Sequence, residues 1–292
     1  MPPRYDTISF LSDYGTTDEF VGVVHSVIRS IAPDVTVVDI THGVPAYDVR
    51  AGGLALARSA QYLCPGVVLA VVDPGVGTER RGVGVEVGDG ASVLVGPDNG
   101  LLAPAVALCG GATRAVELSN ADYQLLSPGP TFAGRDVFAP ASAHLSNGVD
   151  LAELGDPVNV ATLLPGVLPV TYEENGTLVG EVLWVDRYGN AQLNIDPDEI
   201  ELLGERVRVR FADQARTARR VTSFGEVGAG EIGIVVDSYG LLAIVLDRHS
   251  AAEELGLHAS TEVRIEAFDD EGDDDAQHGA TSPVTIRAKA KP

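Results

Sequence analysis

The spacing of apolar residues in the first half of the chain alternates between the period of a strand and that of a helix. Short segments rich in apolar residues predict strands over residues 7–11 and 35–40, and a continuous apolar run predicts a third over 66–72. The segment between the first two strands has helical spacing, with apolar residues at Phe20, Val21, Val24, Ile28 and Ile31. This strand–helix–strand order predicts an α/β domain whose mostly parallel, Rossmann-like sheet lies between helices.

Polar residues suggest where these helices begin. Thr16 or Thr17 is expected to cap the first helix, and acidic residues just after them would favour its dipole. A second helix, rich in alanine, is expected over residues 48–62. Farther on, residues 82–95 contain two short apolar runs around a glycine-rich turn, which predicts a hairpin.

The pattern changes in the second half of the chain. Residues 155–175 are rich in proline and turn-forming residues, which is typical of a linker. Beyond them, short apolar runs separated by turns predict strands near residues 178–185, 191–195, 207–211, 231–236, 241–246 and 262–267. We therefore expect an α/β domain over residues 1–165, a β-rich domain over 166–268 and a flexible tail over 269–292.

The composition of the chain makes some classes of binding partner unfavourable. The formal net charge is −22 over 292 residues, which disfavours binding to nucleic acid or to an anionic membrane. No apolar run approaches the roughly 20 residues of a membrane-spanning helix. Two cysteines, Cys64 and Cys109, provide neither a disulfide framework nor the spacing of a metal site, so we expect a cytoplasmic protein.

The most informative stretch follows the third predicted strand. Asp73 ends the buried run, a Pro-Gly turn follows, and Arg80 and Arg81 come a few residues later. The carboxyl end of a strand is where open α/β sheets bind ligands, so a carboxylate and a guanidinium here indicate a site. The alternative is a structural ion pair that only fixes the loop.

Other candidate residues occupy comparable positions. Asp13 follows the first strand and could accept both hydroxyl protons of a ribose, or could serve only as a turn or cap residue. Tyr47 could belong to the core or form a wall against a nucleoside. His42 is interpreted as a loop histidine rather than a catalyst.

Two turns of the second half and the acidic tail also have alternative interpretations. Residues 186–190 (Asp-Arg-Tyr-Gly-Asn) and 237–240 (Asp-Ser-Tyr-Gly) each join two predicted strands, and either could be only a hairpin turn. The tail's acidic run, residues 269–275, lacks the spacing of a calcium-binding EF-hand loop, so we predict no metal site.

Taken together, several motifs resemble one family. They are Ser-Asp-Tyr-Gly (12–15), Val-Val-Asp-Ile-Thr-His (37–42), Val-Asp-Pro-Gly-Val-Gly-Thr-Glu-Arg-Arg (72–81), Pro-Asp-Asn-Gly-Leu (97–101), Thr-Phe-x-Gly-Arg-Asp (131–136), Asp-x-Tyr-Gly-Asn (186–190) and Ser-Ala-Ala-Glu (250–253). In this order they are similar to the S-adenosyl-L-methionine (SAM) hydroxide adenosyltransferases, which are SAM hydrolases related to the fluorinase and chlorinase.

The resemblance implies an activity and an assembly. It implies hydrolysis of SAM to adenosine and L-methionine, with SAM as substrate and no cofactor. It also implies a homotrimer with each active site between the N-terminal domain of one chain and the C-terminal domain of the next.

The resemblance further implies a function for each candidate residue. Asp13 would hold the ribose diol and Tyr47 would lie near the ribose. Tyr188 and Asn190 would contact adenine. Asp186 would hold the methionine ammonium, with Ser238 near the methionine carboxylate.

The resemblance also exposes a departure in the catalytic set. In the hydrolases an aspartate, an arginine and a histidine surround the attacking water. Asp73 and Arg80 match the first two, but the histidine position is Ala133. Ala133 leaves open a catalytically impaired protein that binds SAM or adenosine. A halogenase is disfavoured, because the halide-using relatives have an aromatic residue at position 73 and the fluorinase has serine at position 134, which is Gly134 here.

Overall fold

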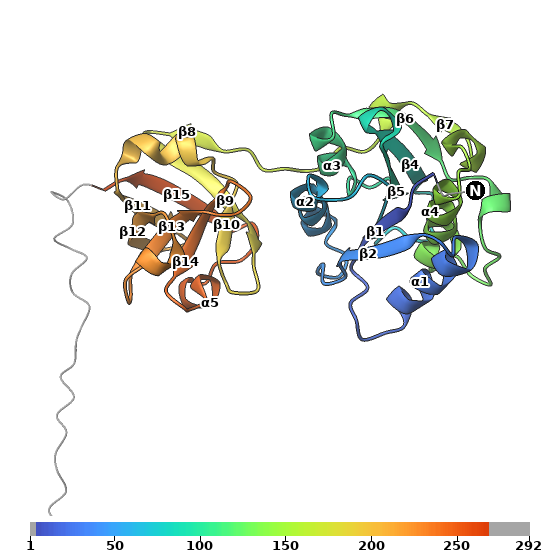
Figure 1. The fold of residues 1–292 in the computed structure, drawn as a ribbon. Helices are drawn as coiled ribbons and strands as arrows, with labels where there is room; N and C mark the ends of the chain where they lie inside the picture. Colours follow the sequence, from blue (N-terminus) through green and yellow to red (C-terminus); the bar gives the residue numbers. More distant parts are fainter. Residues whose placement is uncertain (1–3, 269–292) are drawn as a thin grey trace, which may run out of the picture. The chain divides into compact units, whose positions relative to one another are not determined.

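The computed structural model describes residues 4–268, which fall into two compact units that divide between Leu168 and Pro169. Each unit has its own sheet and its own buried core (Figure 1). The expected tail, including the acidic run at 269–275, lies outside the described residues.

The first unit contains a seven-stranded sheet in the order β2-β1-β3-β5-β4-β6-β7. Short apolar runs form its centre, and every residue of β3 is buried. The strands are β1 (Thr7–Ser12), β2 (Thr36–Thr41), β3 (Val67–Val71), β4 (Gly82–Val87), β5 (Ser92–Pro97), β6 (Ala112–Glu117) and β7 (Pro157–Val158).

The sheet is less parallel than the sequence predicted. Strands β2, β1, β3 and β5 are parallel neighbours, whereas β4 runs antiparallel to both β5 and β6, and β7 runs antiparallel to β6. The predicted hairpin is the cause, because its short turn, η1 (Gly88–Gly90), can join β4 to β5 only in antiparallel order. The parallel arrangement therefore holds only for β2, β1, β3 and β5, and Asp13 and Asp73 follow two of these strands, β1 and β3.

Helices lie on both sides of this sheet (Figure 1). Helix α1 packs against α4, and α2 packs against α3. The helices of the first unit are α1 (Phe20–Ile31), α2 (Val49–Ala60), α3 (Ala103–Leu108) and α4 (Ala139–Ser146), with short turns η2 (Ala121–Tyr123), η3 (Gly134–Phe138), η4 (Leu151–Leu154) and η5 (Val160–Thr162).

The predicted cap of helix α1 is wrong. The N-cap residue is Glu19, which makes no capping hydrogen bond with its side chain, and the first turn contains no acidic residue. Gly15 has a φ of 66° and leads into a turn that places Thr16 and Thr17 before the helix begins. By contrast, the side chain of Asp48 caps α2, accepting a hydrogen bond from the Ala51 N–H at 2.8 Å.

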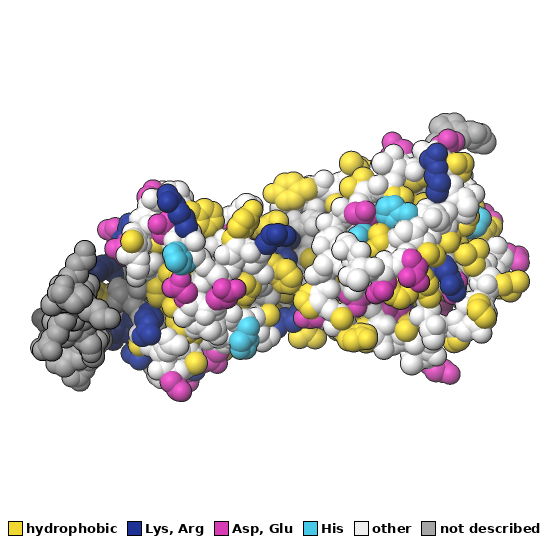
Figure 2. Space-filling model, turned by 90° about the horizontal axis from the view of Figure 1, so that it is seen from below, with side chains coloured by type: hydrophobic (Ala, Val, Ile, Leu, Met, Phe, Trp, Pro, Cys, Tyr) yellow, Lys and Arg dark blue, Asp and Glu magenta, His cyan; other side chains and the backbone are white. Residues whose placement is uncertain are grey.

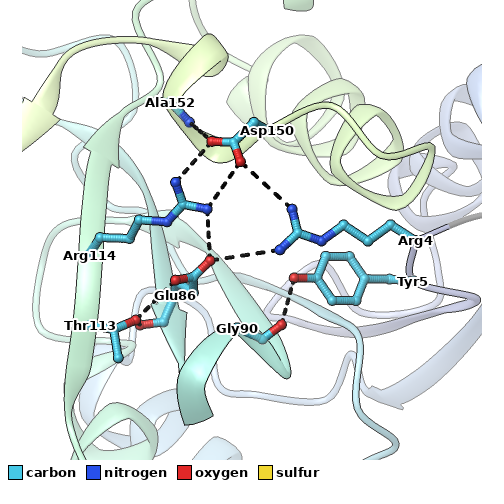
Figure 3. A network of polar contacts seen from close by, with 8 residues as sticks. All are labelled: Arg4, Tyr5, Glu86, Gly90, Thr113, Arg114, Asp150 and Ala152. Atoms are coloured by element: carbon cyan, nitrogen blue, oxygen red, sulfur yellow. Dashed lines mark hydrogen bonds and ion pairs between the residues drawn. The ribbon is translucent and has the colours of Figure 1, made fainter.

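An ionic network joins β4 and β6 of the first unit (Figure 3). Arg114 on β6 donates to Glu86 on β4 at 2.9 Å and to Asp150, just before η4, at 2.9 Å. Arg4 lies 3.9 Å from both carboxylates. The network ties the N-terminal segment, two strands and the start of η4 together.

The second unit is a closed barrel. Its strand order is β10-β14-β13-β12-β11-β15-β9-β8, and an additional pairing between β10 and β9 closes seven strands, leaving β8 outside. The elements are β8 (Tyr172–Glu174), β9 (Thr177–Val185), β10 (Ala191–Leu193), η6 (Pro197–Leu203), β11 (Arg206–Phe211), β12 (Gln214–Val221), η7 (Phe224–Glu226), β13 (Ile232–Val236), β14 (Leu242–Leu246), α5 (Ala251–Leu255) and β15 (Glu262–Ala267).

Surface composition agrees with the acidic sequence. On the face drawn in Figure 2, acidic side chains are scattered among apolar and uncharged ones rather than gathered into one patch. Within the described part of the chain, no helix is both long and apolar enough to cross a membrane.

Candidate functional site

Two predicted carboxylates lie at the same edge of the first sheet. Strands β1 and β3 are parallel neighbours, with Ser12 opposite Val71, so both strands end at this edge. Asp13 follows β1 directly, and its N–H donates to the carbonyl of Val71 at 3.3 Å. Asp73 lies two residues beyond the end of β3. The topology thus brings together residues that are 60 positions apart in the sequence.

Asp73 and Arg80 form a two-pronged ion pair. Arg80 Nε donates to Asp73 Oδ1 at 2.8 Å, and Arg80 Nη2 donates to Asp73 Oδ2. The carboxylate is 5% exposed and the guanidinium 17% exposed, so solvent screens the pair weakly. The Arg80 guanidinium also lies 5.2 Å from the centre of the Phe138 ring. Because each carboxylate oxygen keeps a lone pair, Asp73 can still accept a hydrogen bond from a water.

The neighbouring arginine serves a structural purpose. Arg81 donates to Asp98 through Nε at 3.1 Å and Nη2 at 2.5 Å, and to the carbonyl of Thr162 at 2.9 Å. Asp98 also accepts from the Leu164 N–H at 2.8 Å. Of the two adjacent arginines, Arg80 faces Asp73, whereas Arg81 anchors the segment around residues 162–164.

The loop that carries Ala133 lies against the Asp73–Arg80 loop. A Cβ built on Gly77 would lie 3.0 Å from the carbonyl oxygen of Pro130, and Arg80 stacks on Phe138 at the end of η3. Ala133 is the N-cap residue of η3 and is partly buried. The segment of residues 130–138, which contains Ala133 at the histidine position implied by the resemblance, therefore contacts the loop that carries Arg80.

Sequence reasoning did not assign any function to Tyr14, which the structure places in the same site. Its hydroxyl lies above Gly134, where a built Cβ would be only 2.1 Å from the hydroxyl oxygen. The pKa of Tyr14 is raised well above 10, first by burial and then by the negative charges of Asp13 and Asp73, against the opposing effect of Arg80. An aromatic residue directly after Asp13 was the available signal.

Asp13 also holds a nearby loop. Its Oδ2 accepts a hydrogen bond from the Tyr47 N–H at 2.9 Å. Tyr47 has a φ of 67°, and its side chain is 73% exposed, so it is not a core residue of its unit. The predicted turn function of Asp13 is thus visible, and its oxygens keep lone pairs for a diol.

His42 directly follows β2 and belongs to a small polar cluster. Its Nδ1 is 2.8 Å from Ser12 Oγ, and its Nε2 is 3.1 Å from Asp39 Oδ1, although the angle is too poor for a hydrogen bond. His25 Nε2 lies 2.8 Å from the same Asp39 oxygen. Burial alone would raise the pKa of Asp39, but contacts from His42 and His25 lower it. These contacts support the loop-histidine interpretation.

The same cluster bears on metal binding. Within residues 4–268, His25, Asp39 and His42 are a group whose ligand atoms all lie within 4.8 Å of one another, close enough to hold a metal ion. His25 is hydrogen-bonded to Asp39, whereas the buried Nε2 of His42 has no hydrogen-bond partner among the described residues. The absence of a metal stays a prediction.

The remaining predicted contacts lie on two turns of the barrel. Asp186 Oδ1 accepts from the N–H groups of Tyr188 and Asn190, at 2.8 and 2.9 Å, and Oδ2 accepts from Asn190 Nδ2 at 2.8 Å. Tyr188 is 78% exposed. The carboxylate of Asp186 therefore shapes the turn, which supports the hairpin interpretation without excluding a contact with substrate.

The second turn repeats this design. Asp237 Oδ1 accepts from the N–H groups of Tyr239 and Leu241, at 2.8 and 3.1 Å, leaving the intervening Ser238 exposed. Pairing of β10 with β14 places the two turns at opposite ends of β10, a strand of three residues. Gln192 in that strand bonds to Asp237 and links the two ends.

The fold and the site define a class of protein: an α/β domain with a carboxylate–guanidinium pair at the carboxyl edge of its sheet, followed by a β-barrel. Comparison with known families identifies the class. Residues 8–155 match the SAM hydroxide adenosyltransferase N-terminal domain, and residues 180–264 match the C-terminal domain. The chain belongs to the SAM hydroxide adenosyltransferase family.

Similar proteins cover nearly the whole chain. A protein of Salinispora tropica named (R)-S-adenosyl-L-methionine hydrolase is 43% identical, over 89% of this chain and 97% of its own length. One of the same name from Thermus thermophilus is 41% identical, over 88% and 98%. A fluorinase of Actinopolyspora mzabensis is 29% identical, over 88% and 96%. A solved structure of an uncharacterized conserved protein from Thermotoga maritima aligns with a TM-score of 0.82 at 34% identity, over 89% of this chain and 99% of that one.

Proposed function

We infer that the protein hydrolyses SAM to adenosine and L-methionine. Hydrolases with this substrate in their name are 41–43% identical over almost the whole chain. The observation that carries the proposal is the weakly exposed Asp73–Arg80 pair at the carboxyl edge of the sheet. It supplies a carboxylate and a fixed positive charge at the edge where α/β sheets bind ligands.

The chemistry follows from the substrate and this pair. SAM carries a sulfonium, so methionine departs with a neutral thioether and the leaving group needs little assistance. The difficulty is the nucleophile, because water is weak and hydroxide is scarce at neutral pH. Asp73 accepts a hydrogen bond from the water, which fixes its orientation, and takes its proton as the bond forms.

The bond changes balance without a cofactor. The water oxygen forms a bond to C5′, and the C5′–S electron pair moves to sulfur. Arg80 stabilises the negative charge that develops at the water oxygen. Holding the water in line with the C5′–S bond contributes further, because it removes the entropy cost of the encounter.

The substrate contacts remain those that the resemblance implies. Asp13 binds the ribose diol beside Tyr47, and Tyr188 and Asn190 contact adenine. Asp186 binds the methionine ammonium and Ser238 the carboxylate. Exposure of Tyr47 and Tyr188 supports this proposal, since most of each side chain is left uncovered by its own unit.

The assembly that we propose is a homotrimer in the cytoplasm, with each site shared by neighbouring chains. Its support is that the candidate residues divide between the two units, with the catalytic pair in the first and the adenine contacts in the second. SAM is the substrate, and the mechanism requires neither a metal nor a cofactor.

Two alternatives to SAM hydrolysis remain. Ala133 favours a protein that binds SAM or adenosine but turns over slowly. The fluorinase relatives raise the possibility of a halogenase, but Asp73 and Gly134 oppose it. Adding chloride or fluoride tests this second alternative, because a halogenase would yield 5′-halo-adenosine.

A product assay with one substitution tests the proposal. The unaltered protein incubated with SAM is expected to release equal amounts of adenosine and methionine, measured by chromatography. Asp73→Asn keeps the shape but removes the base, so kcat should fall by about 10²–10⁴-fold. Asp89→Asn, on the exposed η1 turn at the opposite edge of the sheet, serves as a control with unchanged kcat. Absence of adenosine with the unaltered protein would refute the proposal.

A further inference from the structure

Tyr14 has no assigned function, yet its ring is held firmly in the site. Its ring centre lies 6.4 Å from that of Phe10, 5.7 Å from that of Phe20 and 5.6 Å from that of Phe132, and two of these contacts are edge-on. Aromatic pairs at such distances restrict a ring to one orientation. The hydroxyl at its tip is therefore fixed rather than mobile.

The fixed hydroxyl lies against Gly134, next to the position where the resemblance expects a histidine. A Cβ on Gly134 would overlap the hydroxyl oxygen at 2.1 Å and the ring carbon that bears it at 3.1 Å. Gly134 directly follows Ala133. Glycine here leaves the room that the hydroxyl occupies, and alanine before it leaves no competing side chain beyond a methyl group.

The electrostatic surroundings of the hydroxyl agree with this placement. Asp13 and Asp73 both act on it, and so does Arg80. Burial and the two carboxylates keep the phenol protonated at any working pH, and no hydrogen-bond partner for it is found among the described residues. Tyr14 is only partly buried, so water can reach its hydroxyl, and a protonated hydroxyl without a protein partner can donate a hydrogen bond to a bound water.

We propose that the Tyr14 hydroxyl is the third group of the water site, orienting the nucleophile in place of the histidine that the resemblance puts at position 133. The proposal rests on SAM hydrolysis as the function. Water has two hydrogens and two lone pairs; one hydrogen goes to Asp73 and one lone pair attacks C5′. A hydrogen bond that the Tyr14 hydroxyl donates to the other lone pair restrains the remaining rotation of the water.

The proton balance is unchanged by this addition. A protonated phenol is not a base, so the proton of the water goes to Asp73 and Tyr14 begins and ends the step neutral. Tyr14 is thus a group that positions the nucleophile by direct contact.

The test compares Tyr14→Phe with the unaltered protein. The ring contacts are kept and only the hydroxyl is lost, so kcat should fall about 10–100-fold while KM changes less than about threefold. The matched control is Tyr62→Phe. Tyr62 is exposed and follows the C-terminal end of α2, whereas the site adjoins its N-terminal end, so kcat should stay unchanged.

Rescue separates this function from a merely structural one. Ala133→His should restore most of the lost kcat in the Tyr14→Phe protein, because it supplies another orienting group. Gly134→Ala should lower kcat strongly in the unaltered protein and much less in Tyr14→Phe, since the added methyl then meets no hydroxyl.

The outcomes distinguish the two proposals. If the unaltered protein releases adenosine and Tyr14→Phe has the same kcat, or changes only KM, the inference about Tyr14 is wrong and SAM hydrolysis stands. If the unaltered protein releases no adenosine, both are overturned.

Discussion

Position 133 shows how much one residue matters in this site. Alanine occupies the position where the resemblance expects histidine, in a segment that contacts the loop of Arg80. An alanine can neither donate nor accept a hydrogen bond through its side chain, so any restraint on the water beyond the acid and the guanidinium has to come from another residue, as proposed for Tyr14. Binding of SAM depends on other residues and should be largely intact.

Ala133→His is therefore expected to raise turnover. The new imidazole supplies a hydrogen bond to the water, and we expect kcat to rise by up to about 10-fold with KM little changed, because one orienting bond is a small part of a typical acid–base contribution. Adenosine release at saturating SAM is the measurement. Ala161→His, in the exposed η5 turn, is the matched control. An unchanged or lower rate in Ala133→His would contradict the expectation.

At the scale of elements, the Figure 3 network holds distant parts of the first unit together. Glu86 lies on a strand and is 11% exposed at its side chain, and Arg114 on the neighbouring strand is 38% exposed. The hydrogen bond from Arg114 lowers the pKa of Glu86. Burial of the carboxyl acts in the opposite direction but is the smaller effect. A carboxyl whose pKa is lower in the folded than in the unfolded state stabilises the fold only while it is ionised.

Glu86→Gln should thus lower stability in a pH-dependent way. Above about pH 5 an unfolded glutamate is ionised, so the substitution should cost the full contribution, about 1 kcal/mol because Arg114 is partly exposed. As the pH falls through the lowered pKa, the original carboxyl gains its proton and the difference shrinks. Melting temperatures of both proteins between pH 3 and 7 measure this. The exposed Glu79→Gln provides the control, and a pH-independent difference would show that the charge is unimportant.

Some elements were predictable and others were not, for physical reasons. The first strand–helix–strand unit and the Asp73 turn were visible because segments rich in apolar residues end abruptly at polar residues. Strand β12 was missed because three arginines interrupt its apolar alternation, and its identity depends on pairing with β11 and β13. Closure of the barrel could not be predicted either, because it depends on the three residues of β10 pairing with both β14 and β9.

The same contrast applies to the site. Asp73 and Arg80 were predictable as a pair because both flank one glycine-rich turn. Tyr14 was harder to predict: its place directly after Asp13 was the one signal, and its contact with Gly134, 120 residues later in the chain, forms only in the folded structure.

At the scale of the whole molecule, the proposed trimer makes each active site a shared structure. The mass in solution should be about three times the 30.4 kDa of the chain, measured by light scattering. Asp73→Asn and Tyr188→Ala should each lose activity alone, the first through chemistry and the second through adenine contact.

Mixing these two proteins, unfolded and refolded together, tests whether the site is shared. A mixed trimer contains sites that take an intact Asp73 from one chain and an intact Tyr188 from another, so activity should reappear. Refolding each variant by itself is the control. If the mixture stays inactive although mixed trimers form, each site is confined to one chain.

Arg80 and Arg81 are consecutive residues with different attachments, one to the catalytic carboxylate and the other to the backbone near residues 162–164. That segment leads directly into the second unit at Pro169. A shift of residues 162–164 would accordingly act on Arg81, which a single peptide bond joins to the partner of Asp73. The segment that connects the two units is in this way attached to the loop that carries the proposed catalytic pair.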